Sequence, residues 1–322
     1  MARSIIIFGN GLGMALNGAY FRLAAGLEAV WQGSAHFTED HKLMVATAVP
    51  GVSQHIYPQS EAQLDQLQMA IVASDFLKSF ETPQVNWLSD ASRGFPQAFR
   101  AFIHEVAAYF HESGHDLPDS FVMPLAEFVA NTRSHVAVLN YDNLLYDAFH
   151  RTGITNGYDG TLLDGYRRDG FSSGNMDRFN PGRHGWYLHL HGSPLFVGER
   201  KLMGGDRAFL QPTDQCHVVL THVAHKPSII DASAVLSEYW RRLDRAIEEV
   251  EQIILFGYSG EDIHLNDRLR TGCTGKRVHI IEWSGAGAMD ARVNYWANQL
   301  KGCHGNVYHF DNILDFHGWT GL

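Results

Sequence analysis

Residues 135–145, with the sequence HVAVLNYDNLL, indicate the class of fold most directly. It opens with a short apolar run, which predicts a buried strand. Asn140 and Asp142 follow where that strand should end, and a helix is expected from Leu144 because the next apolar residues repeat at helical spacing. In an open α/β sheet, ligands bind just outside the carboxyl ends of the strands. Asn140 and Asp142 therefore stand where ligand-binding residues are expected, although a turn residue and a helix cap would use the same residue types.

Three further apolar runs end in small or polar residues. The run 4–8 is followed by Gly9-Asn10-Gly11-Leu12-Gly13, the run 187–190 by His191-Gly192-Ser193, and the run 253–256 by Gly257-Tyr258-Ser259. Glycines after a strand allow a tight turn and close approach of the backbone to a phosphate. Met14 stands where the pattern Gly-x-Gly-x-x-Gly needs its third glycine, so a plain strand-to-helix turn is the alternative. Four such strand ends predict one composite site on one edge of a sheet.

The order of the predicted elements indicates an α/β fold. In the last part of the chain, strands predicted at 252–256, 277–283 and 306–310 alternate with helices predicted at 262–269 and 286–300. A β-α-β-α-β order favours a parallel sheet with right-handed crossovers. We therefore expect a Rossmann-like parallel sheet with helices on both faces, plus a helical insertion.

The insertion is expected between the first and second motifs, at residues 33–131. Helices are predicted at 61–81, 95–112 and 121–131, and the aromatic residues in them recur at helical spacing, which is typical of a helix core rather than a cofactor site. Residues 33–60 show little periodicity, so a loop or lid is expected there. Such an insertion would cap the site or form an oligomer surface.

The whole chain, 1–322, is interpreted as one domain. Irregular insertions at 151–232 are expected around the strand that leads to His191, and a glycine-rich part of them, 151–186, is expected to contain a hairpin. Another amphipathic helix is predicted at 233–251.

Composition excludes several classes of protein. The net charge is −10, whereas a protein that binds the phosphate backbone of nucleic acids is usually basic, so direct nucleic-acid binding is not expected. No apolar stretch approaches the roughly 20 residues of a membrane helix, so no membrane association is expected. The three cysteines, Cys216, Cys273 and Cys303, are odd in number and widely spaced. They suggest no disulfide framework and fit a cytoplasmic protein.

Taken in this order, the four strand ends resemble the sirtuin-like NAD-binding domain family. That family has a glycine-rich first loop, then Asn-x-Asp after a strand, then His-Gly, then Gly-x-Ser. The segment Tyr20-Phe21-Arg22 resembles the family's Asp-Phe-Arg segment beside the nicotinamide pocket in Phe21 and Arg22, but the acid is absent. The resemblance extends over most of the chain but consists of short matching segments. It looks closest to the zinc-free bacterial branch that hydrolyses NAD, as found in antiphage defence.

The resemblance also implies roles for individual residues. It assigns catalysis to Asn140 and His191, with Asp142 beside them. An asparagine can hold a ribose hydroxyl or a water, and a histidine titrates close to physiological pH and can take a proton. The residues expected to bind the nucleotide are Gly9, Asn10, Gly11, Leu12, Gly13, Phe21, Gly257, Tyr258, Ser259 and Glu282. Glu282 is included because an acid at a strand end holds ribose hydroxyls in other dinucleotide folds.

The activity implied is hydrolysis of NAD, as substrate, to nicotinamide and ADP-ribose by an effector of bacterial antiphage defence that acts through abortive infection. No metal is expected. A four-cysteine zinc site is impossible with three cysteines, which disfavours protein deacylation. A cell must hold such an enzyme inactive. Homo-oligomerisation or a separate regulatory protein, such as an ATPase or an Argonaute-like partner, is therefore expected by analogy.

Two alternatives use the same residues differently. His189 and His191 alternate on a predicted strand and would face the same side, where Asp262 and His264 could complete a metal site of a metal-dependent hydrolase. The other alternative is a module that binds NAD or ADP-ribose as a sensor without cleaving it. Chelation would separate the first alternative from NAD hydrolysis, and an assay for free nicotinamide would separate the second.

Overall fold

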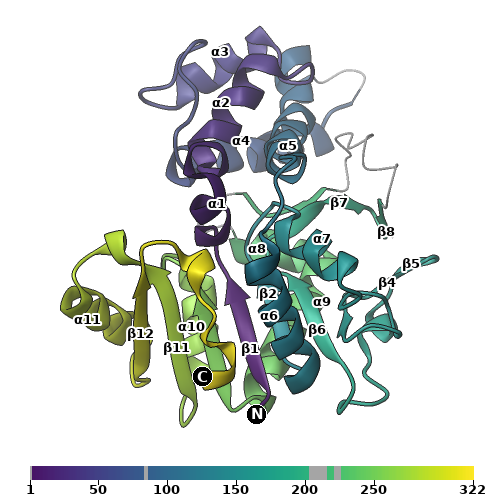
Figure 1. Cartoon of the computed structure of the whole chain (residues 1–322). Helices are drawn as coiled ribbons and strands as arrows, with labels where there is room; N and C mark the ends of the chain where they lie inside the picture. Colours follow the sequence, from purple (N-terminus) through teal and green to yellow (C-terminus); the bar gives the residue numbers. More distant parts are fainter. Residues whose placement is uncertain (1, 83–85, 203–215, 221–225) are drawn as a thin grey trace.

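A seven-stranded parallel sheet forms the centre of the molecule (Figure 1). The computed structural model describes residues 2–82, 86–202, 216–220 and 226–322. The strand order is β12-β11-β10-β1-β2-β6-β3, and neighbouring strands run parallel. These strands are β1 (Ser4–Phe8), β2 (His135–Val138), β3 (Leu162–Leu163), β6 (Gly185–His189), β10 (Gln252–Phe256), β11 (Arg277–Trp283) and β12 (Gly305–Phe310).

The central strand β1 is buried along its whole length. Because side chains alternate along a strand, Ile6 and Phe8 belong to the core on one face of the sheet, and Ile5 and Ile7 to the core on the other. An apolar run without polar alternation is what a doubly covered parallel strand requires.

Helices cover both faces of the sheet, which confirms the predicted fold class. The core on one face contains apolar residues of α6 (Asp119–Thr132) and α7 (Leu144–Arg151). The core on the other face contains residues of α9 (Ala234–Glu249), α10 (Ile263–Gly272) and α11 (Met289–Gln299). No helix among the described residues is both long and apolar enough to span a membrane.

A group of four helices, which we call the helical layer, stands over the carboxyl ends of the strands (Figure 1). It consists of α2 (Leu23–Gly33), α3 (Glu39–Ala48), α4 (Glu61–Ser79) and α5 (Asp90–His111), and α1 (Gly11–Phe21) leads into it from β1. The other three helices pack on α5. Phe95, Phe99 and Phe102 of α5 are all buried, as expected for a helix core.

The expectation of a loop or lid at 33–60 was wrong in part, because α3 lies there. Its N-terminus has a capping box, in which Thr38 and His41 satisfy each other's backbone amides. Only Lys42 and Val45 are buried in this helix. With so few core residues, the helix has no apolar stripe that periodicity could detect.

Apart from β3 and β6, the described residues of 151–232 include small antiparallel pairs of strands outside the central sheet. The predicted hairpin is present as β4 (Tyr166–Arg167) and β5 (Gly170–Phe171). A three-stranded sheet follows, made of β7 (Gly192–Val197), β8 (Arg200–Lys201) and β9 (Cys216–Val218), and then α8 (Lys226–Ala232). Within this range, 203–215 and 221–225 lie outside the described residues, as do 83–85 of the range 33–131.

Cys273 and Cys303 form a disulfide, which the sequence did not suggest. Their Cα atoms are 6.1 Å apart although 30 residues separate them in the chain. Cys273 directly follows α10 and Cys303 lies just beyond α11, and both side chains are buried in the same core. The pairing arises because two neighbouring crossover helices end at the same side of the sheet, which the count and spacing of cysteines do not reveal.

Candidate functional site

The candidate site lies where the strand order reverses. From β1 the chain proceeds outward through β2 and β6 and later returns to β10 on the opposite side of β1. The connections that follow β1 and β10 therefore lead away in opposite directions across the sheet, which leaves room for a ligand outside the strand ends. Ligands of open α/β sheets bind at this kind of switch point.

The two glycine-containing loops at the switch point touch each other. The Gly9 amide donates to the Phe256 carbonyl at 3.0 Å, and the Gly11 amide donates to the Gly257 carbonyl at 2.8 Å. A Cβ atom on Gly9 would lie 2.6 Å from the Gly257 oxygen, which is closer than atoms can approach. Packing of loop against loop is therefore sufficient to require these glycines, whether or not a phosphate binds there.

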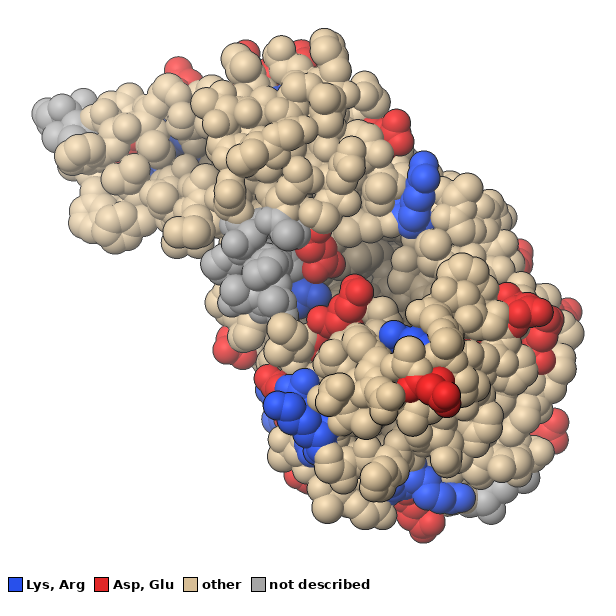
Figure 2. Space-filling view, turned by 90° about the vertical axis from the view of Figure 1, so that its left-hand side faces the viewer, with Lys and Arg blue, Asp and Glu red and all other residues tan. Residues whose placement is uncertain are grey.

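A cavity of about 1220 Å³ opens at this edge of the sheet, below the helical layer. Figure 2 shows it as a hollow between the two parts of the molecule, with acidic and basic side chains around it. Most of the residues named from the sequence line it, namely Gly9, Asn10, Gly11, Phe21, Asn140, Asp142, His191, Gly257, Tyr258, Ser259 and Glu282.

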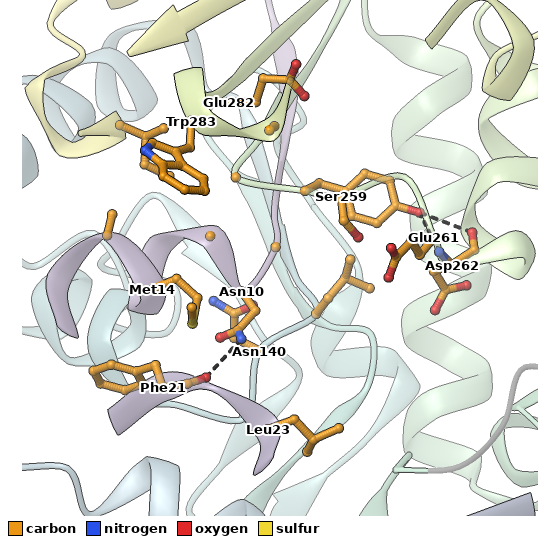
Figure 3. A pocket seen from close by; sticks show the side chains of 18 of the residues that line it. Asn10, Met14, Phe21, Leu23, Asn140, Ser259, Glu261, Asp262, Glu282 and Trp283 are labelled. Atoms are coloured by element: carbon orange, nitrogen blue, oxygen red, sulfur yellow. Dashed lines mark hydrogen bonds between the residues drawn. The ribbon is translucent and has the colours of Figure 1, made fainter. Parts of the chain in front are cut away.

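Three of the residues that were carried over by resemblance are not among those lining the cavity. Leu12 is fully buried in the core. Gly13 lies inside α1, and a Cβ atom there would meet the Phe21 ring at 2.8 Å. Arg22 is also absent from the lining, unlike its neighbour Phe21. The Phe21 carbonyl accepts from the Asn10 amide group at 3.0 Å, which fixes the position of this turn (Figure 3).

Asn140 and Asp142 lie beyond the end of β2. Asn140 is 6% exposed, and its Oδ1 atom has no hydrogen-bond partner among the described residues. The Leu144 amide donates to Asp142 Oδ1 at 3.1 Å, so Asp142 does help to start α7. Burial raises the pKa of Asp142 to about 7, against the opposing effect of hydrogen bonds from Leu144 and Asn140. An orphaned buried acceptor beside a carboxyl group that titrates near neutrality is typical of a binding or catalytic site.

His191 belongs to a buried chain of three charged or polar groups. Its Nε2 atom lies 3.0 Å from Asp262 Oδ2, and Lys226 Nζ donates to the same oxygen at 2.9 Å. Burial opposes ionisation of Asp262, but His191 and Lys226 lower its pKa well below the ordinary range. Lys226 was missed from the sequence because it lies far from every motif, and no spacing links it to His191.

Glu282 lies at the end of β11 and is held by three side chains. Arg292 donates to Oε2 at 2.7 Å, the Trp296 indole donates to Oε2 at 3.0 Å, and His309 lies 3.0 Å from Oε1. Burial would raise the pKa of Glu282, but these hydrogen bonds outweigh it and lower the pKa. Its oxygens already have partners within the protein, so a ribose hydroxyl would have to compete for them.

The structure adds an exposed aromatic side chain that the sequence analysis did not single out. Trp283 directly follows Glu282, is 60% exposed and lines the cavity. Figure 3 shows Trp283 and Met14 on one side of the open space and Glu261 and Asp262 on the other. A base stacks readily on such an indole.

The lining carries more acids than cations. The acidic residues in it are Glu61, Asp142, Glu261, Asp262, Glu282 and Asp311. The basic residues are Lys226 and Arg292, and each is paired with an acid, Asp262 and Glu282 respectively. Acids therefore outnumber cations along the lining as a whole, which suits a ligand that carries a positive group.

The metal-site alternative required His189 and His191 to face the same side of one strand. β6 ends at His189, and the chain turns before Gly192, which has a φ of +80°. His189 packs among Tyr187, Phe196 and Tyr146 and does not line the cavity. No cluster of three or more His, Cys, Asp or Glu side chains that could hold a metal ion occurs among the described residues.

Comparisons with known proteins identify no family. No family model matches the sequence, and no curated protein matches it. One solved structure, described as "Structural Basis for the Mechanism and Regulation of Sir2 Enzymes", aligns over 98% of this chain and 89% of its own, with 12% identity and a TM-score of 0.34. A likeness at this level bears on neither the site nor the activity, so both are argued from the residues of this chain.

Proposed function

We propose that this protein binds NAD in the cavity at the switch point and hydrolyses it to nicotinamide and ADP-ribose. The observation that carries the proposal is the meeting of four separate strand ends around one cavity. Asn140, His191 and the Gly257-Tyr258-Ser259 segment all line it, although they are far apart in the chain. A cavity of about 1220 Å³ is large for a small metabolite and has room for a dinucleotide.

The chemistry of the cavity supports cleavage of an N-glycosyl bond. When that bond breaks, its electron pair goes to the nicotinamide nitrogen and positive charge develops on the ribose. Water then adds to the anomeric carbon and gives up a proton. Asn140 can hold a ribose hydroxyl or this water, because its buried Oδ1 atom has no partner among the residues described. His191 can take the proton.

The charge of the lining supports a cationic reacting group. The nicotinamide ring of NAD carries a positive charge until it leaves, and the ribose carries one in the transition state. Asp142 and Asp262 line the same cavity as His191. A carboxylate held in a partly buried site stabilises a nearby cation more than it would in water. The exposed Trp283 indole offers a stacking surface for the adenine at the other side.

The test is release of free nicotinamide from NAD by the purified protein. We expect wild type to release it, and Asn140→Ala and His191→Ala each to lower the rate at least about 100-fold, which is the usual contribution of a positioned acid or base. Asn143→Ala is the matched control for Asn140→Ala, because Asn143 lies three residues on and does not line the cavity.

Each other result has a defined meaning. Tight NAD binding without release of nicotinamide would indicate that the protein is a sensor or that an activating partner is missing. Neither binding nor release by the wild type would overturn the nucleotide proposal. Equal rates for all variants would remove Asn140 and His191 from the reaction.

The biological part of the proposal rests on the sequence resemblance alone. We propose that the protein acts as an effector of antiphage defence in the bacterial cytoplasm and is restrained by homo-oligomerisation or by a separate regulatory protein. Loss of cellular NAD on infection, only in cells that carry the intact protein, is the expected result. Unchanged NAD levels during infection would argue against this role even if the purified protein cleaves NAD.

A further inference from the structure

His191 makes a buried polar contact with Asp262, which lines the same cavity. The distance from His191 Nε2 to Asp262 Oδ2 is 3.0 Å, and both residues are more than nine-tenths buried. The Tyr141 ring lies over the imidazole at an interplanar angle of 29° and a centroid distance of 6.3 Å. The orientation of the imidazole is therefore set by the protein before any ligand binds.

We propose that Asp262, held ionised by Lys226, is a positioning residue that keeps the proton on Nε2 of His191 and leaves Nδ1 as the atom that accepts a proton. This inference rests on the proposed function for its catalytic meaning. The tautomer of His191 can be tested independently, because it does not depend on any activity of the protein.

The tautomer follows from the chemistry of the two partners. An ionised carboxylate only accepts hydrogen bonds, so Nε2 must be the donor. A neutral imidazole carries one N–H group, so the lone pair lies on Nδ1. Lys226 Nζ, 2.9 Å from the same Asp262 oxygen, disfavours transfer of the proton from Nε2 to the carboxylate.

Asp262 is itself held rigidly. Its Oδ1 atom accepts from the Leu265 amide at 3.0 Å and caps α10. The Tyr258 hydroxyl lies 3.1 Å from both the backbone nitrogen and the carbonyl oxygen of Asp262. Tyr258 belongs to the segment after β10 that the sequence assigned to nucleotide binding, and its hydroxyl instead fixes the start of α10.

The proton balance of the proposed step is simple. Water gives its proton to His191 Nδ1 as its oxygen bonds to the anomeric carbon, and the electron pair of the broken N-glycosyl bond leaves with nicotinamide. The imidazolium that forms keeps its Nε2 proton, which still points at the Asp262 carboxylate. Asp262 stabilises this cation and does not itself become protonated.

The variant Asp262→Asn tests the inference sharply. An amide oxygen that keeps the helix cap at the Oδ1 position places the new amide nitrogen at the Oδ2 position, where it faces His191 and displaces Lys226, which keeps Glu61 as a partner. An amide nitrogen donates, so Nε2 must become the acceptor and the proton must move to Nδ1. In serine proteases the same exchange beside the catalytic histidine lowers kcat about 10⁴-fold because of the wrong tautomer.

The experiment is nitrogen NMR of the full chain labelled with ¹⁵N-histidine, without NAD, in which His191→Gln identifies the His191 signals. We expect an Nε2–H tautomer in wild type and an Nδ1–H tautomer in Asp262→Asn. Nicotinamide release by the same variant should fall about 10³- to 10⁴-fold with KM changed less than about threefold. Asp267→Asn, an exposed residue on the same helix paired with Arg270, is the matched control and should change neither readout.

Either an Nδ1–H tautomer in wild type, or the same tautomer in wild type and Asp262→Asn, would overturn the inference. The wild-type spectrum gives the first of these answers even if the variant does not fold. An Nε2–H tautomer in a wild-type protein that releases no nicotinamide would remove the proposed function but leave the role of Asp262 in orienting His191.

Discussion

Two carboxylates at the ends of neighbouring strands are both buried and both paired with a cation, yet their surroundings differ. Glu282, near the end of β11, is hydrogen-bonded to Arg292, Trp296 and His309, all within the sheet and its covering helices. Asp262, after β10, shares one oxygen between His191 and Lys226. His191 and Lys226 both line the cavity, and Lys226 also lies 3.4 Å from Glu61 of the helical layer.

The difference distinguishes a carboxylate that stabilises the fold from one that acts in the reaction. Of the three partners of Glu282 only Arg292 lines the cavity, so Glu282 mainly stabilises the fold locally and its loss should appear in stability. A carboxylate whose partner is a cavity-lining histidine sets the proton position on that histidine, and its loss should appear in turnover.

The largest stability effect is expected on the Glu282 side. Glu282→Gln leaves the Arg292 guanidinium, only 14% exposed, without its carboxylate. Breaking a buried pair in this way should lower the free energy of unfolding by about 3 kcal/mol, measured by chemical denaturation. Asp290→Asn, an exposed residue of α11, is the control. Equal stability of the two variants would show that Glu282 does not stabilise the fold.

A pH effect is expected from Asp142, the carboxyl group on the His191 side that has no cationic partner in its hydrogen bonds. Burial raises its pKa in the folded state from 3.8 to about 7, so the folded protein binds this proton more tightly than the unfolded chain. The resulting stabilisation is present below the ordinary pKa and is lost as pH rises through about 7.

Asp142→Asn removes this titration. The stability of wild type relative to Asp142→Asn should fall by on the order of 2 kcal/mol between pH about 4 and about 8, less than the full shift implies because the side chain is half-buried. Thermal unfolding across that pH range measures it, and Asp169→Asn, at an exposed position, is the control. A constant difference across the range would contradict the pKa shift of Asp142.

A smaller effect is expected from Trp283, beside Glu282. If its exposed indole stacks on a base, Trp283→Ala should raise the KM for NAD about tenfold, or about 1.4 kcal/mol, and leave kcat within about twofold. Steady-state kinetics measure both values. Trp87→Ala is the matched control, because Trp87 is also 60% exposed and does not line the cavity. A fall in kcat without a change in KM would contradict a role of Trp283 in binding NAD.

The smallest effect on stability and turnover is expected at the contact between Glu61 of the helical layer and Lys226 beside the sheet. Glu61 lies 3.4 Å from Lys226 and its side chain is 34% exposed. A partly exposed pair contributes at most about 0.5 kcal/mol, so Glu61→Gln should change stability and turnover little. Glu39→Gln, which breaks the pair with Lys42, is the control. A tenfold fall in nicotinamide release would instead make Glu61 part of the network that orients His191.

The sequence correctly predicted that the site residues lie at one edge of the sheet, because the carboxyl ends of parallel strands all lie at the same edge. Once β1, β2, β6 and β10 were placed in one parallel sheet, the residues that follow them had to lie on the same side. Asn140 and His191 could therefore be brought together without knowledge of any distance. The long helices were predictable for a similar reason, since their apolar residues repeat regularly.

Other parts of the site were beyond the reach of sequence patterns. Lys226 reaches Asp262 from a segment that has no periodicity, so nothing in the sequence marks it. Asp262 itself was noticed only as a partner in a metal site, because a strand was expected to continue to His191, whereas β6 ends at His189. The Cys273–Cys303 bond depends on where two helices end in space. Each of these contacts is tertiary and joins residues that no local rule connects.

The contact between the two glycine loops has a consequence for how this chain can evolve. A side chain on Gly9 would meet Gly257 oxygen at 2.6 Å, and one on Gly11 would meet Gly257 Cα at 2.6 Å. Gly257 in turn has a φ of +59°, which disfavours any larger residue there. None of these three glycines can accept a side chain while the facing loop keeps its backbone path, so in related chains changes at these glycines should appear together in both loops or not at all.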